Sequence, residues 1–159
     1  MNVGTILNQI STEYSLSAVQ LFDNRYIWSY RHLYSAVWHA LNAKNSNRMI
    51  SKSLSMEVLL YVAAQRQIKK AITLLGIRES TKVVVGLLIG ENSHQVINGN
   101  NHLKAELELI PNINFLNDYS SKRQYFIDML AKNGFPSANF TFSEIEKAVL
   151  QQIALLALE

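Results

Sequence analysis

The 159-residue sequence contains no cysteine, so disulfide bonds and thiolate chemistry are excluded. Its only prolines are Pro111 and Pro136, and no linker rich in glycine, serine or proline indicates a domain boundary. The longest apolar runs, Val58–Ala64 and Val83–Ile89, are far shorter than the ~20 residues that a membrane-spanning helix needs. Met1–Ile10 lacks the basic start and apolar stretch of a signal peptide. These absences predict one soluble domain, over the whole chain, in the reducing cytoplasm.

Hydrophobic residues make up 48% of the chain and charged residues 17%, which is typical of a folded protein rather than a disordered one. The charge is uneven. Residues 1–82 carry ten Lys/Arg against four acids, whereas residues 83–159 carry five against eight. The stretch from Asn24 to Met56 holds no acid and five basic residues, Arg25, Arg31, Lys44, Arg48 and Lys52. Such a stretch attracts polyanions, including nucleic acid. The alternative is a solvated face with an accidental excess of one sign.

The hydrophobic pattern predicts an α/β (α+β) domain, in which several helices pack on a small mixed or antiparallel sheet. Two β-rich segments are expected early in the chain, at Val3–Ile10 and Ala18–Phe22. The β-branched, apolar segment Thr81–Ile89 indicates a central strand, and Ile113–Leu116 a further short one.

Apolar stripes at helical spacing and capping residues mark the helices. They are predicted at Ser29–Ala43, at Met56–Leu75, at Ser121–Lys132, and from Thr141 or Ser143 to the chain end. The second is apolar on two sides, which predicts a helix inside the domain, ended by Gly76 in a left-handed conformation. The second half of Glu91–Leu109 has a helical pattern, but Asn98–Asn101 is expected to break it.

The sequence offers no constellation for catalysis. His32 and His39 share one helix face, but no carboxylate lies within that helix to complete a metal site. Gly86 and Gly90 lie in a strand-like run and match neither the dinucleotide nor the P-loop pattern. The carboxylates are scattered, and no nucleophile elbow is present. The protein is therefore predicted to be no enzyme and to bind no metal or cofactor, and a hydrolase is the most distant alternative.

The best candidate ligand site is the loop Ile50–Ser55. Ser51, Ser53 and Ser55 supply hydroxyls, and Lys52 an ammonium, just before a helix N-terminus, which is a natural phosphate site.

Glu57 follows that loop on an apolar helix face. It is either a first-turn acid that favours the helix dipole, or a half-buried acceptor that orders the loop or binds a ligand hydroxyl. Gln67 is polar on the same face, so the two suggest a polar seam beneath the loop.

Aromatic residues are interleaved with the basic stretch. Tyr30 and Tyr34 fall on the stripe that is predicted to face the core. Trp28 and Trp38, at its margin, are the better candidates for stacking on unpaired bases, at ~1–3 kcal/mol each. Core packing is the alternative for both tryptophans.

The last helix has more apolar residues than one stripe requires. Such a surplus often marks a partner interface, although deep burial is the alternative. The predicted interface consists of Val149, Leu150, Ile153, Ala154 and Leu158.

Several of these segments resemble a known family, the small kinase-binding subunits of the archaeal and eukaryotic KEOPS complex, which include the human kinase-binding homologue. The most specific resemblance is in Ile50-Ser51-x-Ser53-x-x-Met56-Glu57-Val58-Leu59, Gln65-Arg66-Gln67-Ile68-x-x-Ala71-Ile72 and Gly76. His32–Ala43 is similar to the family's first long helix, and Ile145-x-x-x-Val149-Leu150-x-x-Ile153-Ala154-Leu155 to its last. The chain is identified on this basis as an archaeal member.

The resemblance implies a non-catalytic α/β domain that binds and supports the small atypical kinase/ATPase of KEOPS. It also implies tRNA binding at the single-stranded 3′ CCA end, within an assembly that installs threonylcarbamoyl on an anticodon-loop adenosine. Other KEOPS subunits would be contacted only indirectly. The predicted tRNA-binding residues are Arg48, Ser51, Lys52, Ser53, Glu57, Arg66, Lys69 and Lys70. Two alternatives remain: a structural adaptor of a kinase without a specific RNA role, and a standalone RNA-binding domain.

Overall fold

The computed structural model describes residues 2–112 and 118–159, and the expected strand at Ile113–Leu116 lies outside these ranges. Within them, the α-helices are α1 (Val3–Glu13), α2 (Tyr30–Asn45), α3 (Leu54–Ala63), α4 (Ile68–Leu75), α5 (Ser93–Glu106), α6 (Tyr119–Lys132) and α7 (Phe142–Leu156). The strands are β1 (Ala18–Asp23) and β2 (Val84–Ile89), and a short 3-10 helix, η1 (Asn24–Tyr26), follows β1. The predicted mixture of helices with a small antiparallel sheet is confirmed.

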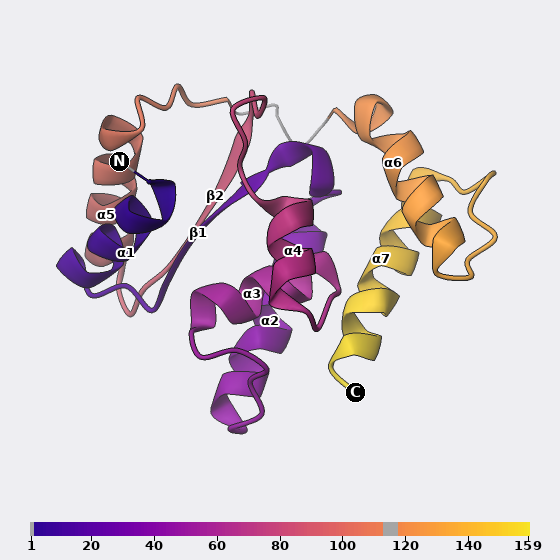
Figure 1. The fold of residues 1–159 in the computed structure, drawn as a ribbon, viewed down its shortest axis with the longest axis horizontal. Coiled ribbons are helices and arrows are strands. Elements are labelled where there is room, and N and C mark those ends of the chain that lie inside the picture. Colours follow the sequence, from indigo (N-terminus) through magenta and orange to yellow (C-terminus); the bar gives the residue numbers. More distant parts are fainter. Residues whose placement is uncertain (1, 113–117) are drawn as a thin grey trace.

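The two strands separate two hydrophobic cores. They pair antiparallel, from Ala18 opposite Ile89 to Asp23 opposite Val84. Because side chains alternate along a strand, β1 presents Val19 and Leu21 to the smaller core, and Ala18 and Phe22 to the larger one. In Figure 1 the strands run between the pair α1 and α5 on one side and the remaining helices on the other.

The first predicted strand, Val3–Ile10, is wrong, because this segment lies in α1. Its buried residues, Ile6, Leu7 and Ile10, have helical spacing, and the Asn2 side chain caps the helix by accepting a hydrogen bond from the Gly4 N–H. The predicted break in α5 is also wrong. Gly99 is buried there, and a Cβ on it would lie 2.8 Å from the Leu16 side chain, so the glycine lets α5 pack closely.

The larger core is built on α2, α3 and α7, which pack against one another. His32 is buried on α2, where its Nδ1 accepts a hydrogen bond from the Trp28 N–H (3.0 Å) and its Nε2 donates to the Val62 carbonyl (2.9 Å). These two bonds fix the neutral tautomer and join the start of α2 to the end of α3. Burial lowers the pKa of His32 to about 4.

The single helix predicted at Met56–Leu75 is two helices. Ala64 ends α3 in the left-handed region (φ 48°), and its N–H donates to the Tyr61 carbonyl. A left-handed backbone at a residue other than glycine costs ~1–2 kcal/mol. The bend at Ala64 offsets this cost, because nearly all of α3 stays buried and α4 places Ala71 and Leu75 in the core. The prediction for Gly76 is also wrong, since its backbone is extended (φ −62°). It must be glycine because a Cβ would clash with the Ile72 carbonyl oxygen.

The later helices match the predictions. Phe126 and Leu130 of α6 are buried, and Gly134, with φ 86°, follows the helix. Of the two candidate caps for α7, Thr141 is the one used. Its hydroxyl accepts from the Glu144 N–H, and the Glu144 carboxylate accepts from the Thr141 N–H, which completes a capping box.

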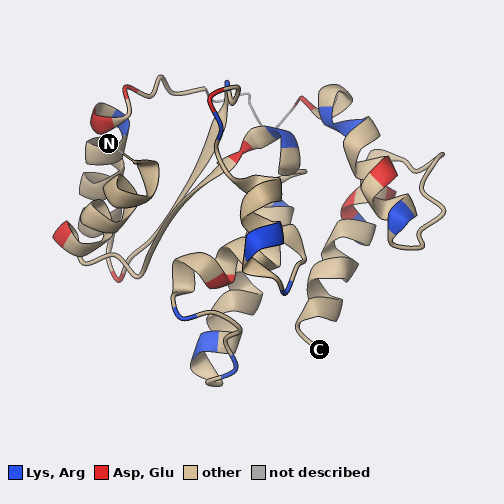
Figure 2. Ribbon diagram, in the orientation of Figure 1, with Lys and Arg blue, Asp and Glu red and all other residues tan. Residues whose placement is uncertain are grey.

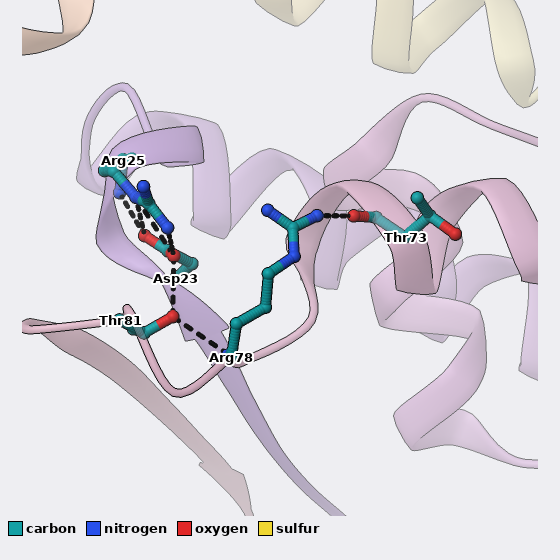
Figure 3. Close-up of polar contacts among 5 residues, drawn as sticks. All are labelled: Asp23, Arg25, Thr73, Arg78 and Thr81. Atoms are coloured by element: carbon teal, nitrogen blue, oxygen red, sulfur yellow. Dashed lines mark hydrogen bonds and ion pairs between the residues drawn. The ribbon is translucent and has the colours of Figure 1, made fainter.

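A buried polar junction joins the sheet to the rest of the molecule where β1 passes into η1, a point at which Figure 2 shows acidic and basic positions side by side. Asp23, which is 1% exposed, accepts hydrogen bonds from the Arg25 backbone and guanidinium and from the Thr81 hydroxyl. Figure 3 shows this cluster continuing through Arg78, whose N–H donates to Thr81 and whose guanidinium donates to the Thr73 carbonyl of α4.

Lys122 attaches α6 to the same junction. Lys122 is 2% exposed. Its ammonium group donates hydrogen bonds to the Asn24 side chain (2.9 Å) and the Ile27 carbonyl (2.8 Å). Burial lowers the pKa of Lys122 to about 8, although nearby Asp118 opposes the shift.

His32 is expected to make the protein sensitive to acid. An unfolded His takes up a proton near pH 6.5, whereas folded His32 resists it until about pH 4. The free energy of unfolding should therefore fall by up to about 3 kcal/mol as the pH drops through this window. We expect His32→Gln, whose amide can accept and donate as the imidazole does, to flatten this slope in urea unfolding measured at several pH values. The matched control is the exposed His94→Gln. If His94→Gln reduced the pH dependence of the free energy of unfolding as much as His32→Gln does, this role for His32 would be contradicted.

Candidate nucleic-acid and partner interfaces

Glu57 organises the loop that was predicted to bind ligand. It is the single acid between Asn24 and Arg78, and it is fully buried. One carboxylate oxygen accepts from the Ile50 N–H (3.0 Å), and the other accepts from the Ser51 N–H (2.8 Å) and the Ser51 hydroxyl (2.8 Å). The interpretation of Glu57 as an acceptor that orders the preceding loop is therefore confirmed.

The serine hydroxyls of this loop are used inside the protein. Ser53 caps α3 by accepting from the Met56 N–H (3.2 Å), and Ser55 accepts from the Val19 N–H of β1 (3.1 Å). Ser51 and Glu57 are buried, so their placement in the predicted RNA contact is corrected to a positioning role. Lys52 is exposed. Gln67 is exposed as well, because the bend after α3 carries it away from the predicted polar seam.

Two cavities adjoin the link between α3 and α4, and Arg66 lines both. The first, here called the Arg48 cavity, has a volume of about 490 Å³ and lies between α2, α3 and the C-terminal residues. Its walls include Trp38, His39, Arg48, Tyr61 and Arg66. The second, here called the Tyr125 cavity, has a volume of about 410 Å³ and is lined by parts of α4, α6 and α7, including Lys70.

The aromatic rings of the Arg48 cavity are packed on one another. The His39 and Tyr61 rings are stacked, with centroids 5.7 Å apart and planes 17° apart, and Trp38 meets His39 edge-on at 4.8 Å. Burial lowers the pKa of His39 and raises the pKa of Tyr61. At neutral pH the cavity thus combines uncharged planar rings with two guanidinium groups, those of Arg48 and Arg66, and one acidic residue, Glu159.

The predicted basic residues all lie on the surface around α3 and α4. Figure 2 shows Lys and Arg positions at the end of α2, in the segments flanking α3, and on α4. The fold brings Arg48 and Arg66 into one cavity and places Lys70 at the other. Lys52 and Lys69 are exposed but line neither cavity.

The predicted roles of the aromatic residues in and just before α2 are largely reversed. Trp28, predicted as a stacking candidate, is 1% exposed and packs against Phe126 and Phe142. Tyr30 and Tyr34, predicted for the core, are 67% and 75% exposed. Together with Trp38, 53% exposed, they form an aromatic stripe on α2 at four-residue intervals. The spacing of the small residues on the other face of α2 was the available signal: Ala36, Ala40 and Ala43 are all buried.

The last helix exposes only part of its predicted interface. Val149 and Ile153 are 3% and 0% exposed, so they belong to the core and are removed from that interface. Leu150 and Ala154 are half-buried, and Leu158, just beyond the helix, is 83% exposed. The α7 and α2 helices are also joined by the pair Arg31–Glu146 (3.1 Å).

Leu158 and Trp38 both line the Arg48 cavity. The exposed stripe of α2 therefore meets the end of α7 there.

No group of three or more His, Cys, Asp or Glu within residues 2–112 and 118–159 is arranged to hold a metal ion. Of the helices in these ranges, none combines the length and hydrophobicity needed to cross a membrane.

Removing the Glu57 carboxylate should loosen the loop and weaken the fold. In Glu57→Ala, the Ile50 and Ser51 N–H groups lose a buried acceptor, so we expect the free energy of unfolding to fall by about 2–4 kcal/mol. Glu57→Gln, which keeps one acceptor oxygen, should have an intermediate effect. Urea unfolding measures both. The control is the exposed Glu79→Ala. Equal midpoints for Glu57→Ala and Glu79→Ala would show that the carboxylate does not hold the loop.

The comparison with protein families agrees with the resemblance of the central segment and the last helix. The model of the family described as kinase binding protein CGI-121 matches residues 1–157. A comparison with individually curated proteins gives no match. Because the family match spans nearly the whole chain, including the loop and α7, the protein belongs to the CGI-121 family of kinase binding proteins.

Proposed function

We propose that this protein is the non-catalytic subunit of a KEOPS complex that binds the small atypical kinase/ATPase and receives the 3′ CCA end of tRNA. In this role it supports threonylcarbamoyl modification of an anticodon-loop adenosine. Membership of a kinase-binding family supports the first partner. The Arg48 cavity, where two arginines and three aromatic rings meet beside an ordered basic loop, is the observation that carries the second.

The chemistry of the Arg48 cavity suits an unpaired nucleotide. Its volume of about 490 Å³ lies within the range of small-ligand sites. Arg48 and Arg66 supply planar guanidiniums, which bind phosphate oxygens in pairs. The exposed face of Trp38 can stack on a base, which requires a base that is not already stacked in a duplex. A single-stranded 3′ end meets these conditions, and a double-stranded stem does not.

The surrounding charge favours the same ligand. Residues 24–78 hold nine Lys/Arg, and their one acid, Glu57, is buried beneath the loop. Lys52, Lys69 and Lys70 are exposed near the two cavities and add attraction for the tRNA backbone. In this proposal Ser53 caps the helix, and Ser51 and Glu57 hold the loop in position without touching the RNA.

Reversing charge at this loop should weaken tRNA binding. We expect Arg48→Glu/Lys52→Glu to lower affinity and to reduce the slope of log affinity against log salt by about one to two. Fluorescence anisotropy at several salt concentrations, with intact tRNA and with tRNA lacking CCA, measures both effects. The matched control is Lys104→Glu/Lys147→Glu, which makes the same charge change on α5 and α7. Equal affinity for the two tRNAs would leave the adaptor role, without 3′-end recognition.

The kinase surface is proposed on the adjoining exposed faces of α2 and α7. Trp and Tyr are the residues that most often dominate binding energy at protein interfaces. Tyr34 is more than half exposed, and Leu158, at the end of the chain beyond α7, is 83% exposed. Leu150 and Ala154 extend this surface along α7. A gathering of large exposed apolar side chains on two packed helices is typical of a partner site.

A charge at Leu158 should prevent kinase association without unfolding the protein. We expect Leu158→Asp to weaken binding at least tenfold, because the carboxylate would be desolvated in the interface. Calorimetry with the co-expressed kinase measures this, and thermal melting checks the fold. Ile110→Asp is the matched control, since Ile110 is 91% exposed and lies elsewhere. Unchanged kinase affinity for Leu158→Asp would place the interface on another face.

A further inference from the structure

The Arg48 cavity also contains an acidic residue. Among the described residues that line it, Glu159 is the one acid, beside the two arginines Arg48 and Arg66. Glu159 and Arg66 line the Tyr125 cavity as well, so this acid lies where the two cavities adjoin. An acid in a site for a phosphate backbone repels that backbone, unless it faces a neutral part of the ligand.

The Glu159 carboxylate is open to a ligand. The residue is exposed, and of the ion pairs within residues 2–112 and 118–159 none joins it to Arg48 or Arg66. A carboxylate only accepts hydrogen bonds, so its partner on a ligand has to be a donor. The cavity therefore combines two guanidinium groups that donate with one group that only accepts.

A nucleotide at the 3′ end of an RNA has donors that an internal nucleotide lacks. Its ribose carries free hydroxyls at both the 2′ and the 3′ position, whereas the 3′ oxygen of every internal nucleotide is esterified to phosphate. In dinucleotide-binding sites an acidic side chain is the usual partner of a ribose hydroxyl. A carboxylate beside arginines thus matches the end of an RNA strand better than its interior.

We infer that Glu159 is a specificity-determining residue, whose carboxylate accepts hydrogen bonds from the 2′- and 3′-hydroxyls of the terminal ribose. The inference rests on the proposed function, since it requires an RNA 3′ end in the Arg48 cavity. The two arginines then hold the phosphate that precedes the terminal nucleotide, Trp38 stacks on its base, and Glu159 binds its ribose. Each part of one nucleotide thus has a partner of matching chemistry.

The same carboxylate disfavours other ends. A 3′-phosphate would place a phosphomonoester against Glu159, and an internal nucleotide would place a phosphodiester there. Both groups are negative, so the carboxylate repels them. A 2′,3′-dideoxy end brings no charge, but it leaves the carboxylate without a donor. The cavity is therefore expected to prefer a free 2′,3′-diol to each of these alternatives.

Fluorescence anisotropy with the full chain and tRNAs that differ only at the 3′ end tests this inference. The ligands end in a free diol, a 3′-phosphate or a 2′,3′-dideoxynucleotide, or lack CCA altogether. We expect the diol to bind about fivefold more tightly than either altered end, as the loss of one hydrogen bond predicts. Glu159→Ala should remove both preferences. Glu159→Gln should bind the 3′-phosphate about as well as the diol, but should keep part of the preference over the dideoxy end, because its amide oxygen still accepts a hydrogen bond. Glu106→Gln, which changes an exposed acid on α5, is the matched control.

The outcomes separate this inference from the proposal on which it rests. Equal binding of intact tRNA and tRNA lacking CCA would overturn both, because no 3′ end would occupy the cavity. If CCA is required but the three ends bind alike, the 3′-end site stands and the role of Glu159 is overturned. The role is also overturned if Glu159→Ala keeps both preferences. An equal gain in affinity for all three ends in Glu159→Ala would overturn it too, since Glu159 would then act only as a general negative charge.

Discussion

The constraint on which this fold depends is that β1 and β2, the strands of the described residues, have a hydrophobic core against each face. Two strands alone are marginally stable in water, so β1 and β2 persist only because a separate core covers each face. Val19 faces the core of α1 and α5, and Phe22 faces the core of the remaining helices. Burial raises the pKa of Asp23 at the end of β1, but its hydrogen bonds from Arg25 and Thr81 outweigh this, and its pKa lies below the usual value. The ionised Asp23 carboxylate therefore joins β1 to the Arg25 and Thr81 segments through charge-assisted hydrogen bonds.

The candidate RNA site derives its shape from the same sheet. The Val19 N–H of β1 donates to Ser55 at the start of α3, and Glu57, two residues later, accepts from the Ile50 and Ser51 N–H groups. The basic loop is thereby attached to both the strand and the helix. A loop that is already ordered loses less conformational entropy when it binds, so internal use of the serine hydroxyls favours ligand binding by the neighbouring charged groups.

The sequence was sufficient for the elements whose signals are local. Thr141 with Glu144 defines the start of α7, and the apolar run of β2 defines a strand. Glu57 could also be identified, because an isolated acid on an apolar helix face needs donors nearby, and the loop supplies them. These predictions required only the residues within one or two turns of each position.

The errors arose where tertiary packing overrides local preference. Tyr30 and Tyr34 lie on a plausible apolar stripe, but α2 buries the face that carries its small alanines and leaves the tyrosines outside. Ala64 carries no sequence signal for a left-handed turn, and the bend there is stabilised by its backbone hydrogen bonds and by the residues of α4 that it buries. Similarly, Gly99 would break an isolated helix, but in α5 it allows contact with Leu16.

The position of Arg66 also follows from that unpredicted bend. In a continuous helix from Met56 to Leu75, Arg66 would lie on one face of that helix. Because α3 ends at Ala63, Arg66 instead lies in a short link and lines both the Arg48 cavity and the Tyr125 cavity. Residues at the end of α7, including Leu156, also line both. The two cavities therefore share residues of the link after α3 and of the end of the helix proposed to meet the kinase, so the proposed RNA and kinase surfaces adjoin each other.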